Sequence, residues 1–159
     1  MKILGIDPGL ERIGWALVLR EGSRLTALEY GLIQTPRVEL PERLRMVHEQ
    51  ACELFDRTAP DALATERQLF AANKTTALLV AHALGVVLLA ASERGLEWAE
   101  YAPPEIKQAV VGNGSADKKQ VQFMVQRLLL LKETPKPDDV ADALAIAICH
   151  AMRSRVSGL

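Results

Sequence analysis

Aromatic residues are scarce in this 159-residue chain, and so is any excess of positive charge. Phe, Trp and Tyr make up 4% of the sequence, so an extended platform of base-stacking side chains is not expected. The 19 Lys and Arg residues are balanced by 20 Asp and Glu residues, for a formal net charge of −1. This balance excludes a uniformly basic nucleic-acid coat but says nothing about local basic patches.

Cysteine is also rare. The two cysteines, Cys52 and Cys149, lie in apolar helical patterns with no spacing typical of metal ligands. We therefore expect both to pack as small core residues in a reducing compartment. The three histidines, His48, His82 and His150, lie in helical patterns as well, and we interpret them as structural.

Long uninterrupted apolar runs are missing. The longest, residues 77–91, contains His82 and Gly85 and is shorter than the roughly 20 residues of a membrane span. No signal-peptide pattern opens the chain. With 49% apolar and 25% charged residues, the sequence predicts one soluble, cytoplasmic domain over residues 1–159 without a membrane partner.

The pattern along the chain predicts an α/β fold. Short apolar runs over 2–7, 13–19 and 25–35, joined by Pro-Gly and Glu-Gly-Ser turns, predict an antiparallel meander of three strands. Helices and strands then alternate, which predicts a mixed five-stranded sheet with helices on both faces. The expected later strands are 61–66 and 97–101, and the expected helices are 41–58, 74–94, 103–111, 116–131 and 139–152.

Acidic residues mark the ends of these elements. Asp7 ends the first strand and Glu66 the fourth, while Asp139 and Asp142 open the last helix beside Asp138. Taken singly, Asp7 also suits a turn before Pro-Gly, and Asp138 or Asp139 also suits a helix N-cap. In open sheets of this type, however, ligands bind beyond the carboxyl ends of the strands.

Asp139 and Asp142 are harder to explain structurally. Their i, i+3 spacing puts both on one helix face, next to the strongly apolar segment 143–148. An unpaired carboxylate against a core is costly, and a cation removes that cost. Carboxylates without Cys or His ligands favour Mg²⁺ or Mn²⁺, and two such ions about 3.5–4 Å apart typically serve phosphoryl chemistry.

Five motifs together resemble the bacterial RuvC Holliday junction resolvases. They are Ile6–Gly9 (IDPG), Ala64–Glu66 (ATE), Lys107–Gly112 (KQAVVG), Gly114–Lys118 (GSADK) and Asp139–Ala147 (DVADALAIA). IDPG alone also occurs in actin-like kinases and other RNase H-like proteins. The last two motifs at this spacing are much more specific, and the resemblance runs from end to end.

The resemblance implies an RNase H-like fold and a homodimeric, Mg²⁺-dependent endonuclease that nicks two opposed strands of a four-way DNA junction. It implies that Asp7, Glu66, Asp139 and Asp142 bind two metal ions, with Mn²⁺ as a substitute. Asp138 falls one position outside the pattern and is interpreted as a solvated neighbour or cap. The resemblance also suggests the RuvA–RuvB branch-migration complex as a partner.

Basic residues near these motifs are candidate DNA contacts. Lys118 matches the catalytic-site lysine of the family and Lys107 a DNA-binding position, whereas Lys119 has no such match. A solvated helix end is the alternative interpretation for the first two. We expect Arg67 and Phe70 to lie in a DNA-facing loop, with Lys74 following as a phosphate contact.

The family places a stacking aromatic near this loop, and Phe70 is one position away from it. Leu69 is the alternative, and burial of Phe70 is equally plausible. The predicted helix 74–94 is apolar on more than one face, which indicates a second packing partner. The resemblance puts the dimer contact there, and a two-fold dimer matches two identical cuts.

Three other functions compete with this one. An RNase H-like nuclease acting on RNA or RNA–DNA hybrid is the nearest. An actin-like phosphotransferase needs two related domains, for which 159 residues are too few. A junction scaffold without activity is disfavoured by the complete carboxylate set.

Overall fold

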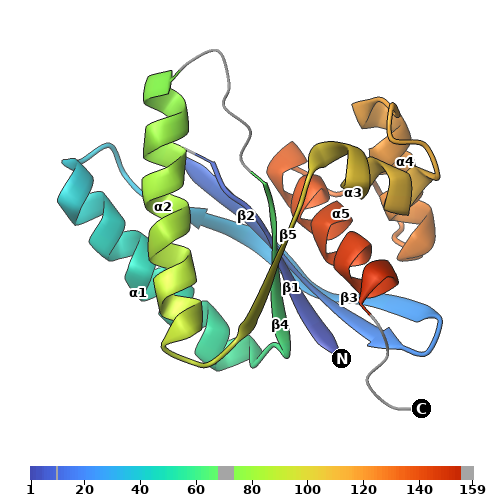
Figure 1. The fold of residues 1–159 in the computed structure, drawn as a ribbon, viewed down its shortest axis with the longest axis horizontal. Helices are drawn as coiled ribbons and strands as arrows, with labels where there is room; N and C mark the ends of the chain where they lie inside the picture. Colours follow the sequence, from blue (N-terminus) through green and yellow to red (C-terminus); the bar gives the residue numbers. More distant parts are fainter. Residues whose placement is uncertain (10, 68–73, 155–159) are drawn as a thin grey trace.

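Five strands form one sheet in the computed structural model, which describes residues 1–9, 11–67 and 74–154 (Figure 1). The strands are β1 (Lys2–Asp7), β2 (Arg12–Glu21), β3 (Arg24–Gln34), β4 (Ala62–Glu66) and β5 (Glu97–Tyr101). The helices are α1 (Leu40–Thr58), α2 (Lys74–Ser92), α3 (Pro103–Val111), α4 (Lys118–Leu128) and α5 (Asp138–Arg153).

The sheet has the strand order β3-β2-β1-β4-β5. β1, β2 and β3 pair antiparallel, whereas β4 pairs parallel with β1 and with β5. The predicted meander with added parallel strands is therefore confirmed. β1 is central and covered on both faces, which explains why Ile3, Leu4 and Ile6 are all fully buried in an almost continuous apolar run.

One face of the sheet is covered by α1 and α2 (Figure 1). Val47, Ala51 and Phe55 recur along α1 at helical spacing and pack on a core cluster that includes Leu4 of β1. The helix has a Pro in its first turn, where the missing N–H costs nothing, and its cap residue, Ala59, is left-handed with φ 43°.

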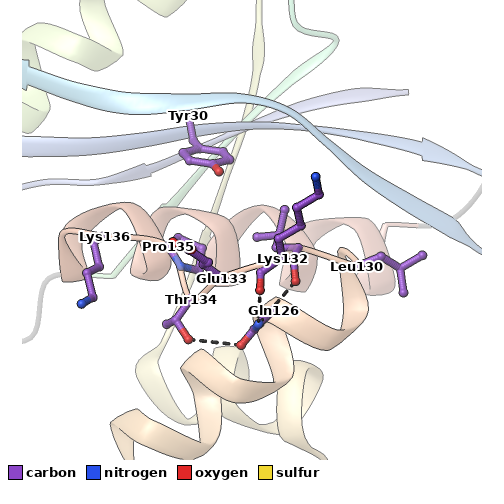
Figure 2. A pocket seen from close by; sticks show the side chains of 9 residues that line it. Tyr30, Gln126, Leu130, Lys132, Glu133, Thr134, Pro135 and Lys136 are labelled. Carbon is purple, nitrogen blue, oxygen red and sulfur yellow. Dashed lines mark hydrogen bonds between the residues drawn. The ribbon is translucent and has the colours of Figure 1, made fainter.

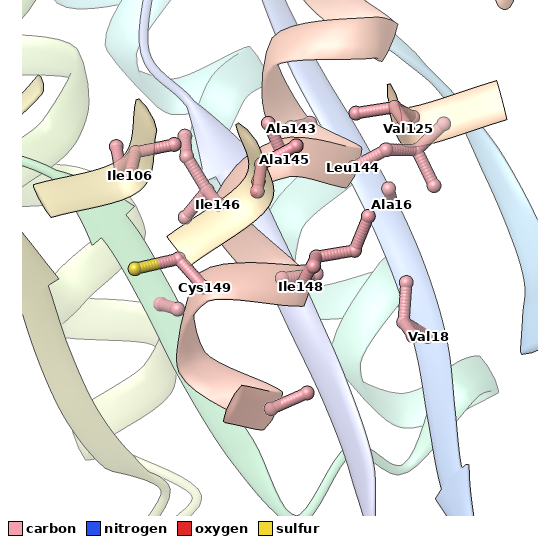
Figure 3. Packing of buried hydrophobic residues seen from close by; sticks show 14 of the residues in the cluster. Ala16, Val18, Ile106, Val125, Ala143, Leu144, Ala145, Ile146, Ile148 and Cys149 are labelled. Carbon is pink, nitrogen blue, oxygen red and sulfur yellow. The ribbon is translucent and has the colours of Figure 1, made fainter. Parts of the chain in front are cut away.

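The opposite face holds α3, α4 and α5. Nearly every residue of α5 from Val140 to Ala151 is buried, because this helix lies between the sheet and the other two helices. Figure 3 shows this layer, with Ala16 of β2, Ile106 of α3 and Val125 of α4 gathered around α5. The prediction of helices on both faces is confirmed.

Helix α4 is shorter than the predicted 116–131. It begins after Asp117, whose side chain accepts a hydrogen bond from the backbone N–H of Gln120, and it ends before Leu130, whose φ is 53°. Ala116 is buried but precedes the cap. Apolar spacing alone does not reveal where capping and a left-handed residue stop a helix.

Helix α2 is the most apolar element. Over Thr75–Ser92 it is long and apolar enough to meet a length-and-composition test for a membrane span, with a mean hydropathy of 1.9. The apolar run identified in the sequence, residues 77–91, is shorter than this window. Core helices of soluble proteins meet the same test, and α2 packs with Ala83, Val87 and Ala90 on the core that it shares with α1.

Candidate active site

Asp7 and Glu66 end two neighbouring parallel strands at the same edge of the sheet. Ile6 of β1 pairs with Thr65 of β4, so the next residue of each strand is a carboxylate. Side chains alternate along a strand, and Ala64, two residues before Glu66, lies in the core cluster beneath α5. The side chains of β1 alternate in the same way, so Asp7 points to the same face of the sheet as Glu66. Both carboxylates therefore face the α5 side.

Helix α5 brings Asp139 and Asp142 to this edge. It crosses the sheet so closely that a Cβ on Gly14 would lie 2.0 Å from the carbonyl oxygen of Asp139. A Cβ on Gly5 would lie 2.2 Å from the carbonyl oxygen of Ala143. Only glycine leaves room for a helix backbone at these two positions, so the glycines of β1 and β2 determine how near the α5 carboxylates come to Asp7.

The four carboxylates affect one another electrostatically. Burial, and then repulsion from Asp142, Glu66 and Asp139, raises the pKa of Asp7 from 3.8 to about 8. Burial, followed by Asp142, raises the pKa of Glu66, and burial also raises that of Asp142 itself. Burial is the largest cause in all three cases, and the mutual repulsion adds to it because the carboxylates lie at the same edge of the sheet.

Lys118 supplies positive charge at the rim of this cluster. From the first turn of α4, its Nζ lies 3.2 Å from Oδ2 of Asp142 and 3.2 Å from Oδ2 of Asp138. Burial by itself would lower the pKa of Lys118, but Asp142 and then Asp138 outweigh it and raise the value. Asp138 is exposed and accepts a further bond from Gln122, while Pro137 occupies the cap position of α5. Asp138 is therefore a solvated neighbour and not a cap.

Arg12 is a member of the site that the sequence analysis missed. Its Nη2 lies 3.0 Å from Oδ2 of Asp139, an oxygen that is buried and accepts no hydrogen bond. Arg12 stands at the first position of β2, two residues before Gly14, and so on the same face of the sheet. Nothing in the local sequence around Arg12 signals this pairing, because its partner is 127 positions away in the chain.

Unlike the carboxylates, the candidate DNA contacts do not all lie together in the structure. Lys107 on α3 lies near enough to Glu66 to offset part of the rise in the pKa of that carboxyl, which burial dominates. Lys119 is exposed on α4 and makes no ion pair with the carboxylates. Arg67 is held by Glu100, with Nε 3.2 Å from Oε2. Leu69 and Phe70 lie outside the described residues, as does the side chain of Lys74, at which α2 begins.

The donor set suits a hard cation. All four acidic side chains offer oxygen, the ligand that Mg²⁺ and Mn²⁺ favour. Oδ2 of Asp139 is buried and accepts no hydrogen bond, and it is paired with the Arg12 guanidinium, so a metal ion would also satisfy it. In the described part of the chain, the side chains already gathered at ligand spacing are different ones, His48, Cys52 and Glu93, on the opposite face of the sheet.

Comparison with known proteins identifies the family. A family model described as "Crossover junction endodeoxyribonuclease RuvC" matches residues 3–150. The chain belongs to the RuvC family. The RuvC protein of Moorella thermoacetica is 52% identical over 152 residues, which cover 95% of this chain and 91% of that protein. The RuvC protein of Alkaliphilus metalliredigens is 49% identical, with coverage of 95% and 93%.

Solved RuvC structures share the fold. Thermus thermophilus RuvC superposes with a TM-score of 0.89 at 40% identity, covering 96% of this chain and 94% of that one. The same protein in complex with Holliday junction substrate has a TM-score of 0.90 at 39% identity, with coverage of 96% and 93%. The yeast mitochondrial Holliday junction resolvase Ydc2 shares the fold at 16% identity, with a TM-score of 0.68. The predicted family and fold are confirmed.

A large open hollow of about 990 Å³ lies elsewhere on this RuvC family member (Figure 2). Tyr30 of β3 faces it from the sheet, and residues 130–136, between α4 and α5, form its other wall together with Gln126. None of the four carboxylates lines this hollow. The size of a hollow is therefore a poor guide to the chemistry here, and the candidate active site is defined by its charges.

Proposed function

We propose that this chain is a Holliday junction-resolving endonuclease that makes paired, symmetric nicks in four-way DNA junctions during homologous recombination and DNA repair. Family membership supports the activity, and the Thermus relative in complex with Holliday junction substrate supports the substrate. The observation that carries the proposal is the set of four carboxylates at the ends of β1 and β4 and the start of α5. In this proposal, residues 1–159 act as one nuclease domain.

Asp7, Glu66, Asp139 and Asp142 would hold two Mg²⁺ ions, with Mn²⁺ as a substitute. When bound, such ions supply an activated water and stabilise negative charge at the phosphate during in-line displacement. The chain itself supplies the oxygen ligands, and Asp7, which is repelled by the other three carboxylates, must lose its proton to act as one. The binding energy of the ions offsets the cost of holding four carboxylates together.

Lys118 has a separate role in this proposal. Its ammonium group is held at the rim by Asp138 and Asp142, where it can stabilise charge that develops on the scissile phosphate. Lys107, on the same side of the sheet, suits a salt-dependent phosphate contact. We further propose DNA contacts by Lys119, Arg67, Lys74 and Phe70, with Leu69 as the alternative to Phe70.

A second copy of the chain would pack on α2. Leu78 and Leu89 are 61% and 54% exposed, and with Ala81 and Gly85, also exposed, they form one stripe along this helix. Exposed leucines in such a stripe indicate a protein interface. A two-fold dimer would present two active sites for two symmetric cuts. We propose that the dimer acts in the cytoplasm with RuvA–RuvB and that the stripe meets protein, not lipid.

The variant Asp7→Asn tests the activity. Binding and cleavage of a synthetic mobile four-way junction are measured separately, the latter with Mg²⁺ or Mn²⁺. We expect binding to persist and cleavage to vanish, because an amide cannot replace a shared anionic ligand. Retained cleavage would refute the site, and faster cutting by the natural protein of a linear duplex or an RNA–DNA hybrid would refute the proposed substrate.

A further inference from the structure

Three side chains of different chemistry meet between α1 and the end of α2. His48 and Cys52 lie one turn apart on α1, and Glu93 directly follows α2. One ligand atom from each lies within 4.8 Å of the other two. The group is on the α1–α2 face of the sheet, whereas the four carboxylates face α5, so it is separate from the proposed active site.

The distances match those around a tetrahedral ion. Nε2 of His48 lies 3.2 Å from Oε2 of Glu93 and 3.7 Å from Sγ of Cys52. Zinc binds nitrogen or oxygen at about 2.0–2.2 Å and sulfur at about 2.3 Å, so tetrahedral angles separate such ligands by roughly 3.3–3.6 Å. The ligand atoms of Cys52 and Glu93 lie within 4.8 Å of each other, so we expect the three side chains to close around an ion by rotation.

We propose that His48, Cys52 and Glu93 form a Zn²⁺ site whose fourth position is open to water. Zinc is a borderline-soft ion that accepts this mixture of sulfur, nitrogen and oxygen, whereas Mg²⁺ does not select thiolate or imidazole. Cys52 is partly exposed and Glu93 is exposed, so an ion can reach the site from solvent. On binding, the thiol of Cys52 releases its proton to solvent and the sulfur ligates as thiolate.

The neighbouring Arg94 does not exclude a cation. Its Nη1 lies 3.8 Å from Oε2 of Glu93, but its Nε and Nη2 donate to Asp56 at 2.6 and 2.9 Å. The guanidinium also contacts Cys52, but its charge is paired chiefly with Asp56. A thiolate and a carboxylate together neutralise Zn²⁺. Loading therefore takes the site from −1 to 0, because the Cys52 thiol releases one proton, and leaves no net positive charge beside Arg94.

A bound ion would join α1 to the segment that follows α2. The bridge adds a cross-link to the apolar contacts of side chains such as Val47 and Val87 and to the ion pair between Asp56 and Arg94. Because the ion binds the folded chain and not the unfolded one, saturating Zn²⁺ raises the midpoint of thermal unfolding. The same ion would stabilise the end of α2, the helix that carries the exposed Leu78–Leu89 stripe.

Co²⁺ is the spectroscopic probe for this site, used on the whole protein. We expect one equivalent to produce tetrahedral d–d bands and a thiolate-to-cobalt charge-transfer band, and Zn²⁺ to remove both. The variant Asp7→Asn should keep the bands, because the carboxylate cluster contains no sulfur. Cys52→Ser should lose the charge-transfer band. A folded natural protein without the band in excess Co²⁺, or a band that survives Cys52→Ser, overturns the proposal.

Thiol labelling gives a second measurement that does not depend on Cys52→Ser folding. Cys149 is fully buried, so a thiol reagent reports on Cys52 in the native protein. We expect stoichiometric Zn²⁺ to slow labelling at least tenfold, and the variants His48→Asn and Glu93→Gln to lose most of that protection. Labelling that is unaffected by Zn²⁺ in the natural protein contradicts the site.

Discussion

The carbonyl oxygen of Asp139 lies directly over Gly14, with only 2.0 Å between that oxygen and the place where a Cβ would stand. Gly14 is in turn paired with Asp7 across β1 and β2. One glycine thus separates two of the proposed metal ligands, and any side chain there would push α5 away from the sheet. The geometry of the proposed active site depends on this contact as much as on the carboxylates themselves.

The variant Gly14→Ala is expected to lose both stability and cleavage. Overpacking a tight contact costs about 1–3 kcal/mol in the free energy of unfolding, and a backbone neighbour cannot rotate away. Urea unfolding and single-turnover junction cleavage measure the two effects. Gly85→Ala is the control for unfolding alone, since Gly85 lies in the proposed dimer stripe. Its Cβ meets nothing within 4 Å in the protomer, and helix propensity favours alanine by about 0.5–1 kcal/mol. Equal stability of the two variants would contradict the close-approach argument.

Stability without divalent cations should fall as the pH rises from about 4 to about 8. The pKa of Asp7 is about 8 in the folded chain and near 3.8 when unfolded, so over this range the folded state binds more protons and loses free energy as they leave. Asp7→Asn should flatten the dependence and stabilise the protein at pH 8 by more than about 1.4 kcal/mol, the value of one pKa unit. Urea unfolding in chelator at several pH values measures it. A natural protein more stable at pH 8 than at pH 5 would contradict the prediction.

Removing Lys118 should impair the chemical step more than DNA binding. We expect Lys118→Ala to lower single-turnover cleavage about 10²–10³-fold, as is typical when one stabilising donor is lost. Lys119→Ala is the matched control, because that neighbouring side chain is exposed and forms no ion pair with Asp142. Similar cleavage rates for the two variants would refute the distinct role of Lys118.

Arg12 should compete with divalent cations for Asp139. The Arg12→Ala variant removes a positive charge 3.0 Å from Oδ2 of Asp139, so half-maximal cleavage should need a several-fold lower Mg²⁺ concentration. Arg37→Ala is the control, since Arg37 pairs with the exposed Glu11 instead. An unchanged or higher Mg²⁺ requirement in Arg12→Ala would show that the ion pair does not restrict cation binding.

A charge on the exposed stripe of α2 should dissociate the dimer. Leu89→Glu should sediment as a folded monomer and lose paired cuts, because burying an unpaired carboxylate in an interface is costly. Leu130→Glu is the control, as Leu130 is 84% exposed but lies between α4 and α5. A natural protein that is monomeric at assay concentrations would refute the proposed interface.

Much of this architecture can be read from local sequence. Strand and helix periods predict all ten elements within a few residues, because Ile3–Ile6 and Val140–Ala151 carry unmistakable burial patterns. Asp7 and Glu66 stand out because each ends an apolar strand. The end of α4 cannot be read from the sequence in this way, because nothing in the local residue types shows that Leu130 takes a left-handed backbone conformation.

Two features depend on contacts between distant segments. Arg12 meets Asp139, and Glu93 meets His48, only because the sheet and the α1–α2 pair bring these segments together. His48 and Cys52 have i, i+4 spacing in the sequence, but without Glu93 beside them this spacing predicts no more than two structural side chains. Cys149 is fully buried as predicted, whereas Cys52 is only half-buried, with its sulfur beside His48.

The linear sequence was sufficient for the family and the element order and for naming the candidate acidic residues, because burial periodicity and motif spacing are local properties. The folded chain decided how close those acids come, which cations pair with them, and that a second ligand set forms on the far face. Helix approach over Gly5 and Gly14 is a property of two packed surfaces. No single segment encodes it.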